Sequence, residues 1–372
     1  MKWSALTQVI CLMYSTKMLA GSLNADANSF NLMRLLAALC VLFSHSFVVV
    51  LGRDAVEPLM TTTPYSLGQH AVNVFFVLSG LMLAQSLDRD PNLVRFVKAR
   101  ILRIFPGLFA YGFVFALVMG PFLTNLTFVE YVSDIHTFVY PFDVMLHFQN
   151  ATPPHGIFAG APAGSVVNLP LWTIRYELAA YIGLVAIFAL GFLRKASGAI
   201  LVLASVLALF LLATMFIPRP AGDTFVHHLL RYGLCFMIGV AAYHLSSRIP
   251  VSAWLLPLTA LSAWLMRDTL LEEPAFLLFA AHLVLVGGSR SYGALTRWTR
   301  RTDISYGTYI YGWPVQQSLE VFFPGLGVAG LTVTAVLIVP LLGLASWRYV
   351  EEPALRLKRV SAVELVARKW HA

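Results

Sequence analysis

Charged residues are scarce in this chain of 372 residues. They make up 12% of the sequence, whereas about a quarter is usual for a soluble domain. Hydrophobic residues make up 58%, and the mean hydropathy is +0.74. The three cysteines all lie in or beside apolar segments, so no disulfide or metal framework is expected. The composition excludes a water-soluble fold and predicts an all-α, polytopic membrane protein.

Long apolar runs give the chain its organisation. They predict about ten transmembrane helices, several of them short for a full crossing. The sequence shows no internal repeat and no low-complexity linker. The ten runs are residues 29–51, 69–86, 104–123, 168–192, 198–217, 229–245, 251–266, 273–289, 304–323 and 326–347.

The basic residues predict the orientation. The net charge is +8 and the pI is about 9.5. With the N-terminus in the cytoplasm, most of the 26 Lys and Arg residues fall on inner connections, while outer connections hold only Arg53, Arg219 and Arg267. This asymmetry follows the positive-inside rule. We therefore interpret the charge as topology rather than as a nucleic-acid surface, and we expect both termini in the cytoplasm. The predicted parts are an interfacial segment (1–28), a transmembrane domain (29–350) and a basic cytoplasmic tail (351–372).

The first run carries two ionisable residues, Arg34 and His45. Eleven helical positions separate them, so they share one face and lie about 16 Å apart along the axis. Charges inside a bilayer usually face a bundle interior or a polar pathway. Alternatively, Arg34 extends to the interface and His45 is a hydrogen-bonded packing residue. Because two such residues share one face, we expect the functional site on this helix.

Other polar residues admit two interpretations each. Arg100 and Arg103 are three positions apart on a helix and suit phosphate binding, but they also fit an inside-positive stop signal. Glu177, close to Arg175, is either half of a structural ion pair, which spacing slightly favours, or the group that orients a catalytic base.

The ninth run is rich in aromatic and amide side chains. Tyr309, Tyr311, Trp313 and Gln316 could bind a sugar or could pack between helices.

Two further groups of residues are expected to carry no chemistry. Ser44 and Ser46 flank His45, but adjacent helix positions point apart, so a Ser–His nucleophile pair is not expected. The long outer segment 124–168 contains His136, His147 and His155, whose spacing resembles no metal site, so we interpret them as solvated loop histidines.

Six motifs follow one another along the chain: the Arg34–His45 pair, residues 68–80, the Arg100–Arg103–Pro106 motif, residues 171–177, residues 305–314 and residues 347–353. Their order resembles that of the acyltransferase-3 family, bacterial integral membrane proteins that O-acylate surface carbohydrates. The resemblance covers about residues 28–358. One departure stands out: many members place a histidine where this chain has Gly312.

The resemblance implies a donor, an acceptor and roles for the residues. Acyl-CoA, expected to be acetyl-CoA, would give its acyl group to a hydroxyl of a surface or lipid-linked carbohydrate such as lipopolysaccharide or exopolysaccharide. The expected partners are that carbohydrate and membrane lipids, without nucleic acid or metal; a homo-oligomer and glycan-synthesis partners stay open. The expected location is the bacterial inner membrane. The residues with expected roles are His45 as base or acyl carrier, Arg34 and Glu177 as catalytic, Arg34, Arg100 and Arg103 for the donor, and Tyr309, Tyr311, Trp313 and Gln316 for the acceptor.

Two other classes remain open on the sequence alone. A transporter or flippase would also have many spans with buried charges, but inverted repeats and broken helices in matching halves are not evident. A non-catalytic receptor or scaffold gives no reason for His45, Glu177 and two inner arginines to occur together.

The charge asymmetry generates a prediction about topology. Reporter fusions after Lys195 and after Arg301 should read cytoplasmic, and a fusion within residues 152–163 should read external. A cytoplasmic signal from the last fusion would overturn the ten-span topology.

Overall fold

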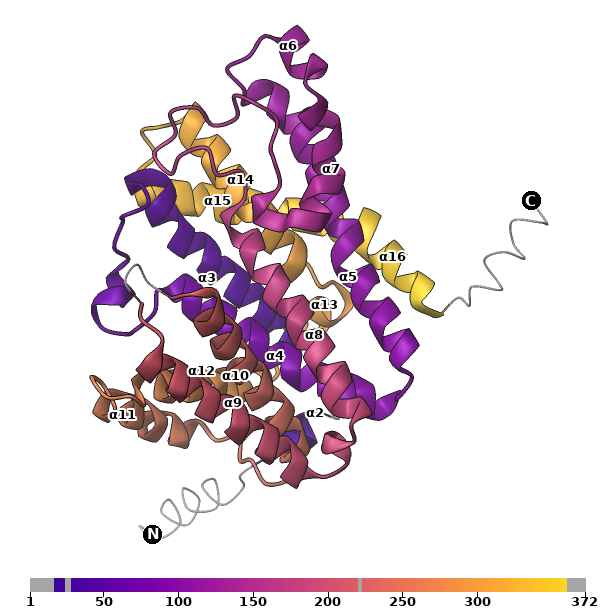
Figure 1. Cartoon of the computed structure of the whole chain (residues 1–372), viewed down its shortest axis with the longest axis vertical. Coiled ribbons are helices and arrows are strands. Elements are labelled where there is room, and N and C mark those ends of the chain that lie inside the picture. Colours follow the sequence, from indigo (N-terminus) through magenta and orange to yellow (C-terminus); the bar gives the residue numbers. More distant parts are fainter. Residues whose placement is uncertain (1–16, 24–27, 220–222, 360–372) are drawn as a thin grey trace, which may run out of the picture. The chain divides into compact units, whose positions relative to one another are not determined.

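The computed structural model describes residues 17–23, 28–219 and 223–359. Across these residues every regular element is a helix and no strand forms, which confirms the all-α prediction (Figure 1). Residues 1–16 and 24–27 of the expected interfacial segment, and most of the predicted tail, lie outside the described residues. The α-helices are α2 (Leu19–Leu23), α3 (Phe30–Leu51), α4 (Leu67–Arg89), α5 (Leu93–Val114), α6 (Phe128–Ser133), α7 (Ile135–His147), α8 (Ile174–Ala189), α9 (Ala196–Phe216), α10 (Phe225–His244), α11 (Leu256–Leu265), α12 (Glu272–Gly288), α13 (Ala294–Arg301), α14 (Ser305–Phe322), α15 (Gly327–Ser346) and α16 (Glu352–Arg356).

Seven helical segments of the described chain are long and apolar enough to cross a membrane. The other three predicted spans correspond to α11, α12 and α14, which have 10, 17 and 18 residues. The count of ten therefore stays a prediction, as does the side on which the termini lie. The seven segments are Phe30–Leu51, Leu67–Arg89, Leu93–Phe122, Leu169–Ala189, Ala196–Phe216, Phe225–His244 and Gly327–Arg356.

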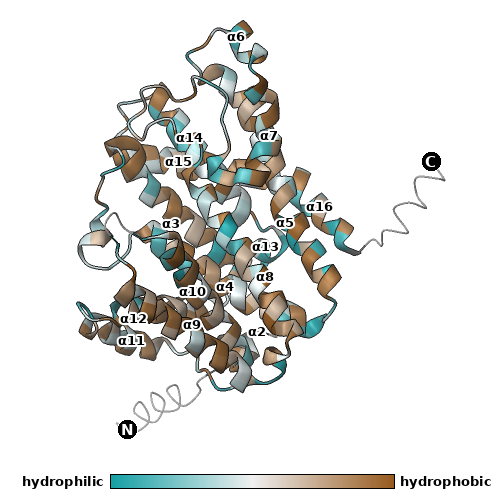
Figure 2. Ribbon diagram, in the orientation of Figure 1, coloured by the Kyte–Doolittle hydropathy of each residue, from teal (hydrophilic) through white to brown (hydrophobic). Residues whose placement is uncertain are grey.

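The surface of these helices is suited to lipid. Figure 2 colours most of α9 and α12 as hydrophobic. On α9, the side chains of Leu201, Leu209 and Leu212 are 50% to 57% exposed. Large exposed apolar surfaces on helices of this length are stable only where hydrocarbon replaces water. The chain is a multi-pass membrane protein.

The third span differs from its prediction. Hydropathy places the start of this span at residue 104, but the basic residues before it already belong to the same helix, α5. The Asn92 side chain caps this helix by accepting a hydrogen bond from the Arg95 amide. The helix continues through a π-helical turn, Phe115–Met119, and a 3-10 turn to Phe122. A cap before the basic residues thus starts the helix earlier than hydropathy indicates.

The last span also runs further than predicted. After α15 the helix continues through a π-helical turn, Trp347–Glu351, and into α16. The boundary expected at residue 350 therefore falls inside a helix. The boundary itself stays a prediction, but Glu351 is fully buried and belongs structurally with the spans.

Contacts within the chain divide it into two units. The first comprises the described residues up to Arg34, then Val72–Gln85 and Ala179–Arg301. Within it α9 packs on α10 and α11 packs on α12. Segment 72–85 of α4 meets α10 at two glycines: a Cβ on Gly80 would lie 2.0 Å from the Phe236 carbonyl oxygen, and one on Gly239 would lie 2.0 Å from that of Val77. Only glycine permits so close an approach of two backbones.

The second unit comprises Leu35–Ala71, Ser86–Leu178 and the described residues from Thr302 onward. Within it α5 packs on α7, and α14 lies beside α15. The latter pair crosses at Gly307 and Gly343, where a Cβ on Gly307 would lie 2.8 Å from the Gly343 Cα. Small residues at this crossing again bring two backbones together.

The glycine crossing in the first unit generates a prediction. Gly80→Ala should lower the stability of the folded protein by about 1–3 kcal/mol, because its methyl group overlaps the α10 backbone. Gly183→Ala is the matched control, since a Cβ there meets nothing within 4 Å and should stabilise its helix. Thermal unfolding of both variants in detergent measures the difference. A melting temperature for Gly80→Ala at or above that of the unchanged protein would refute the close crossing.

Candidate functional site

Helix α3 presents His45 within the second unit. The imidazole is half-buried and packs edge-to-face against the indole of Trp313, with ring centroids 5.1 Å apart and planes at 85°. None of the residues that the structure describes forms a hydrogen bond with this imidazole. The indole therefore fixes the ring by contact alone. Both ring nitrogens stay available to a substrate.

The two serines beside His45 are engaged elsewhere. The Ser44 hydroxyl donates to the carboxylate of Glu57, which is 3% exposed and also accepts from the Leu67 amide at the start of α4. The Ser46 hydroxyl donates to the Leu42 carbonyl at 3.1 Å and accepts from Thr332 at 2.8 Å. Neither hydroxyl is bonded to His45. The arrangement agrees with the prediction that no Ser–His pair forms.

Helix α14 holds this part of α3 in place. The fully buried amide of Gln316 donates to the Leu42 carbonyl at 2.8 Å and to the Ser46 hydroxyl at 2.7 Å. At Gly312 a Cβ would lie 2.7 Å from a methyl carbon of Leu42, which is 1% exposed. The glycine that replaces the family's histidine thus occupies a close helix contact. A histidine there would displace Leu42, three residues before His45.

Segment 148–168 is attached to the same helix; it belongs to the connection 124–168 that is predicted to lie outside, so we call it the outer segment. The Trp313 indole N–H donates to the Val166 carbonyl at 2.8 Å, and the Gln317 amide donates to that of Gly164 at 3.0 Å. The Asn168 amide donates to the Ile310 carbonyl at 2.8 Å. That carbonyl lacks its usual helical partner because residue 314, four positions later, is a proline without an N–H. Asn168 supplies the missing donor.

Arg103 lies in a junction of buried charges. Its guanidinium donates to Glu351 at 3.0 Å and to Asp303 at 2.6 Å, and it lies over the rings of Tyr306 and Trp347. Glu351 has no exposed surface and also accepts from the Ser346 hydroxyl. A buried carboxylate needs such partners. The junction connects α5 to the start of α14 and the end of α15.

No hydrogen bond, ion pair or ring contact joins His45 to Arg100 or Glu177 among the described residues. Arg34 lies on α3 as predicted, belongs to the first unit and has its guanidinium over the Phe75 ring at 6.0 Å. Arg100 lies over Phe96 at 5.7 Å on the same helix as Arg103. Glu177 is half-buried in the first turn of α8. Their expected roles, including orientation of His45 by Glu177, stay predictions.

The predicted sugar-binding residues are mostly inaccessible. The side chains of Tyr311, Trp313 and Gln316 are buried, which favours the packing interpretation for these three. Tyr309 is half-buried. Its hydroxyl donates to the Pro170 carbonyl at 3.0 Å and lies 2.8 Å from the Thr173 hydroxyl. Of the four, Tyr309 is the one with exposed surface near the outer segment. Acceptor binding by this set stays a prediction.

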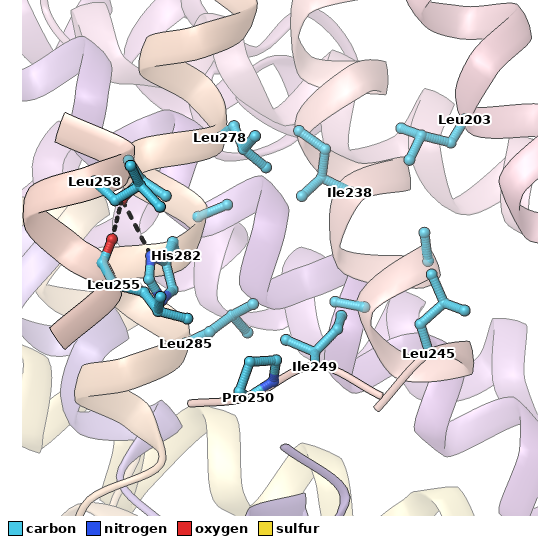
Figure 3. A pocket seen from close by; sticks show the side chains of 14 residues that line it. Leu203, Ile238, Leu245, Ile249, Pro250, Leu255, Leu258, Leu278, His282 and Leu285 are labelled. Atoms are coloured by element: carbon cyan, nitrogen blue, oxygen red, sulfur yellow. Dashed lines mark hydrogen bonds between the residues drawn. The ribbon is translucent and has the colours of Figure 1, made fainter. Parts of the chain in front are cut away.

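The first unit contains an apolar cavity of about 380 Å³ between α9, α10, α11 and α12. Figure 3 shows leucine and isoleucine side chains around it. The ionisable side chain of the lining is His282, whose Nδ1 lies 3.1 Å from the Thr259 hydroxyl. A lining of this kind suits hydrocarbon, and its histidine is already paired with Thr259, whereas the imidazole of His45 has no hydrogen-bond partner among the described residues. We therefore place the candidate site at His45.

Sequence reasoning missed the acidic residues of the second unit. Asp303 and Glu351 stand beside or inside quoted motifs, and an acidic residue directly after an apolar run was a signal for Glu351. Glu57 comes from a connection between two spans, where an acidic residue carries no local signal. Only the fold shows that it is buried against α3 and α4.

Comparison with known proteins identifies relatives along nearly the whole chain. A family model described as an acyltransferase domain matches residues 27–347. Nodulation protein 10 of Rhizobium leguminosarum bv. viciae is 27% identical over 381 residues, covering 92% of this chain and 96% of that protein. An O-acetyl transferase of Shigella phage Sf6 is 28% identical over 343 residues, covering 88% of this chain and 95% of the phage protein. No solved structure matches the chain.

The charge junction generates a prediction about Arg103. Arg103→Ala should lower stability by about 3–5 kcal/mol, because it removes a cation from the buried carboxylate of Glu351. The double variant Arg103→Met with Glu351→Gln should recover part of the loss. Arg95→Ala is the matched control on α5, since its pair with Asp90 is exposed and contributes at most about 1 kcal/mol. Thermal unfolding in detergent compares them. Normal stability of Arg103→Ala with lost acyl-CoA binding would assign Arg103 to the donor instead.

Proposed function

The chain belongs to the acyltransferase-3 family of membrane O-acyltransferases, and we propose that it moves an acyl group from cytoplasmic acyl-CoA to a hydroxyl of a carbohydrate. Acetyl is the expected acyl group, which the name of the phage relative supports. The expected acceptor is a surface or lipid-linked glycan, and the expected location is the bacterial inner membrane. Family membership removes the transporter and scaffold alternatives that the sequence left open.

The reaction needs one base and one route for the leaving group. The acceptor oxygen attacks the thioester carbonyl, its C–O bond forms, and the C–S bond to CoA breaks. The hydroxyl proton passes to a base and then to the departing thiolate, so that CoA leaves as a thiol. A base held within hydrogen-bond reach of the hydroxyl contributes about two to four orders of magnitude in rate.

We propose His45 as the base that takes the proton of the acceptor hydroxyl. The supporting observation is its half-buried imidazole, fixed against Trp313 and without a hydrogen-bond partner among the described residues. An imidazole already bonded to a carboxylate or carbonyl would have one nitrogen fewer for a substrate. Transient transfer of the acyl group to His45 itself uses the same free nitrogen. Glu177 is proposed to act at this site without a described contact to the ring.

Its surroundings keep α3 rigid near His45. Gln316 fixes the Leu42 carbonyl and Ser46, while Glu57 fixes Ser44. Positioning of this kind matters because a catalytic group displaced by about 1 Å can lose a factor of about 100 in rate. The serines thus serve the imidazole by holding its helix, not by reacting.

The donor is proposed to bind through arginines. The phosphates of CoA require cations, and guanidinium groups match phosphate in a bidentate manner. We assign this role to Arg34, Arg100 and Arg103; because Arg103 also donates to two carboxylates, its role is a supporting one. Arg34 is half-buried, and its Nε has no hydrogen-bond partner among the described residues. Tyr309, with Tyr311, Trp313 and Gln316 behind it, is proposed to contact the acceptor.

Substitutions of His45 and Arg34, towards opposite ends of α3, should therefore impair different steps. His45→Ala should reduce transfer about 100-fold to 10,000-fold and leave acyl-CoA affinity nearly unchanged. Arg34→Ala should weaken acyl-CoA binding, and Arg34→Lys should recover little because an ammonium lacks the planar fork. Acyl-CoA affinity and transfer to the isolated glycan are measured side by side, with detergent-monitored stability checked first.

His45→Gln is the matched variant that keeps size and hydrogen bonding but removes the base, and it should be as inactive as His45→Ala. Near-normal transfer by either well-folded variant would make His45 a packing residue, and the mechanism would be wrong. An unchanged acyl-CoA affinity in Arg34→Ala would contradict the donor assignment alone.

A further inference from the structure

Three side chains of metal-binding type converge where α6 meets α7. The ligand atoms of Asp134, His136 and His155 all lie within 4.8 Å of one another. Asp134 and His136 are half-buried, and His155 is exposed. His136, His147 and His155 were expected to be solvated loop histidines whose spacing resembles no metal site. The fold instead brings two of them together beside a carboxylate.

Backbone contacts of the second unit build this cluster. Asp134 separates α6 from α7 and caps α7 by accepting from the His136 amide at 3.0 Å. His155 arrives from the outer segment 148–168, and its amide donates to the other carboxylate oxygen of Asp134 at 3.0 Å. The Thr124 hydroxyl donates to the His155 carbonyl at 2.9 Å. The Asp134 carboxylate is thus held by the backbone amides of both histidines, and the His155 backbone is held by Thr124.

The side-chain atoms already face one another. The Nδ1 of His155 lies 2.9 Å from an Asp134 oxygen, and the rings of His136 and His155 meet edge-to-face at 5.1 Å. Ligand atoms around a tetrahedral zinc ion lie about 3.3 Å apart, given bonds of about 2.0–2.1 Å. The ligand atoms lie at most 4.8 Å apart, about 1.5 Å more than that spacing, a difference that side-chain rotations can close.

We propose that Asp134, His136 and His155 form a zinc site with three protein ligands and water in the fourth position. Two imidazoles and one carboxylate are a common ligand set for Zn²⁺, whereas Mg²⁺ and Ca²⁺ prefer oxygen ligands throughout. Asp134 can accept its two amide hydrogen bonds and still bind the ion, because a carboxylate has about four acceptor positions. Zinc replaces the present Asp134–His155 side-chain contact with stronger bonds.

The site would fasten the outer segment to α7. That segment supplies Gly164 and Val166, whose carbonyls accept hydrogen bonds from Gln317 and Trp313, and Trp313 packs against His45. Zinc bound to His155 would therefore hold the chain eleven residues before Val166, whose carbonyl accepts the hydrogen bond from the Trp313 indole. The ion is a structural zinc ion that holds the outer segment on α7, and it takes no part in acyl transfer.

The test uses the full-length protein in detergent, stripped with chelator and titrated with ZnCl₂ or MgCl₂. Calorimetry should show one Zn²⁺ per chain, and zinc should raise the melting temperature by about 2–4 °C, whereas magnesium should do neither. His136→Ala and His155→Ala should each raise the dissociation constant for zinc at least about tenfold. His147→Ala is the matched control, since His147 is an exposed histidine of α7 paired with Asp143 outside the cluster, and it should bind zinc normally.

Asp134→Asn covers the case in which an alanine variant fails to fold. Asparagine keeps the helix cap but supplies no carboxylate, so the protein should fold and bind zinc at least about tenfold more weakly. No zinc binding to the unchanged protein, or binding unaffected by loss of His136 and His155, would overturn the proposal. An equal loss in His147→Ala would overturn it as well, because binding would then be non-specific.

Discussion

Polar groups that lack water must find partners within the protein, and this constraint shapes the second unit. Glu351 is fully buried and is held by Arg103 and Ser346. The amide of Gln316 is fully buried and donates to the backbone of α3. An unsatisfied group in such surroundings costs about 1–3 kcal/mol. Each contact therefore fixes a helix position as well as removing a penalty, and together they connect α3, α5, α14 and α15.

His45 stands out against this background. Its neighbours Ser44 and Ser46 are hydrogen-bonded, while its own imidazole has only an aromatic contact with Trp313. A substrate hydroxyl could bond to the imidazole without breaking a hydrogen bond that the described residues already make. Arg103 differs from His45 in this respect. Its guanidinium already has two carboxylate partners, so its first role is structural.

The sequence predicted the helical class, the membrane setting and the importance of the first long helix, because these depend on hydropathy and on single charges within one element. It also gave a chemical reason for interest in His45 before any contact was known. The junction of Arg103 with Asp303 and Glu351 was not predictable, because the two carboxylates lie 200 and 248 positions after Arg103 in the chain. Burial was equally hidden: Tyr311, Trp313 and Gln316 resemble a sugar-binding face in sequence but pack inside the protein. The early start of α5 was missed because hydropathy does not register the cap at Asn92.

Pro314 makes the shape of α14 depend on a residue outside the helix. The carbonyl that it leaves without a helical donor is satisfied by Asn168, at the end of the outer segment. A relative with an ordinary residue at 314 would have an N–H for that carbonyl, and the buried amide at 168 would lose its acceptor. The two positions should therefore be inherited as a pair, so that the outer segment and the helix beneath it evolve as a single unit although 146 positions separate them along the chain.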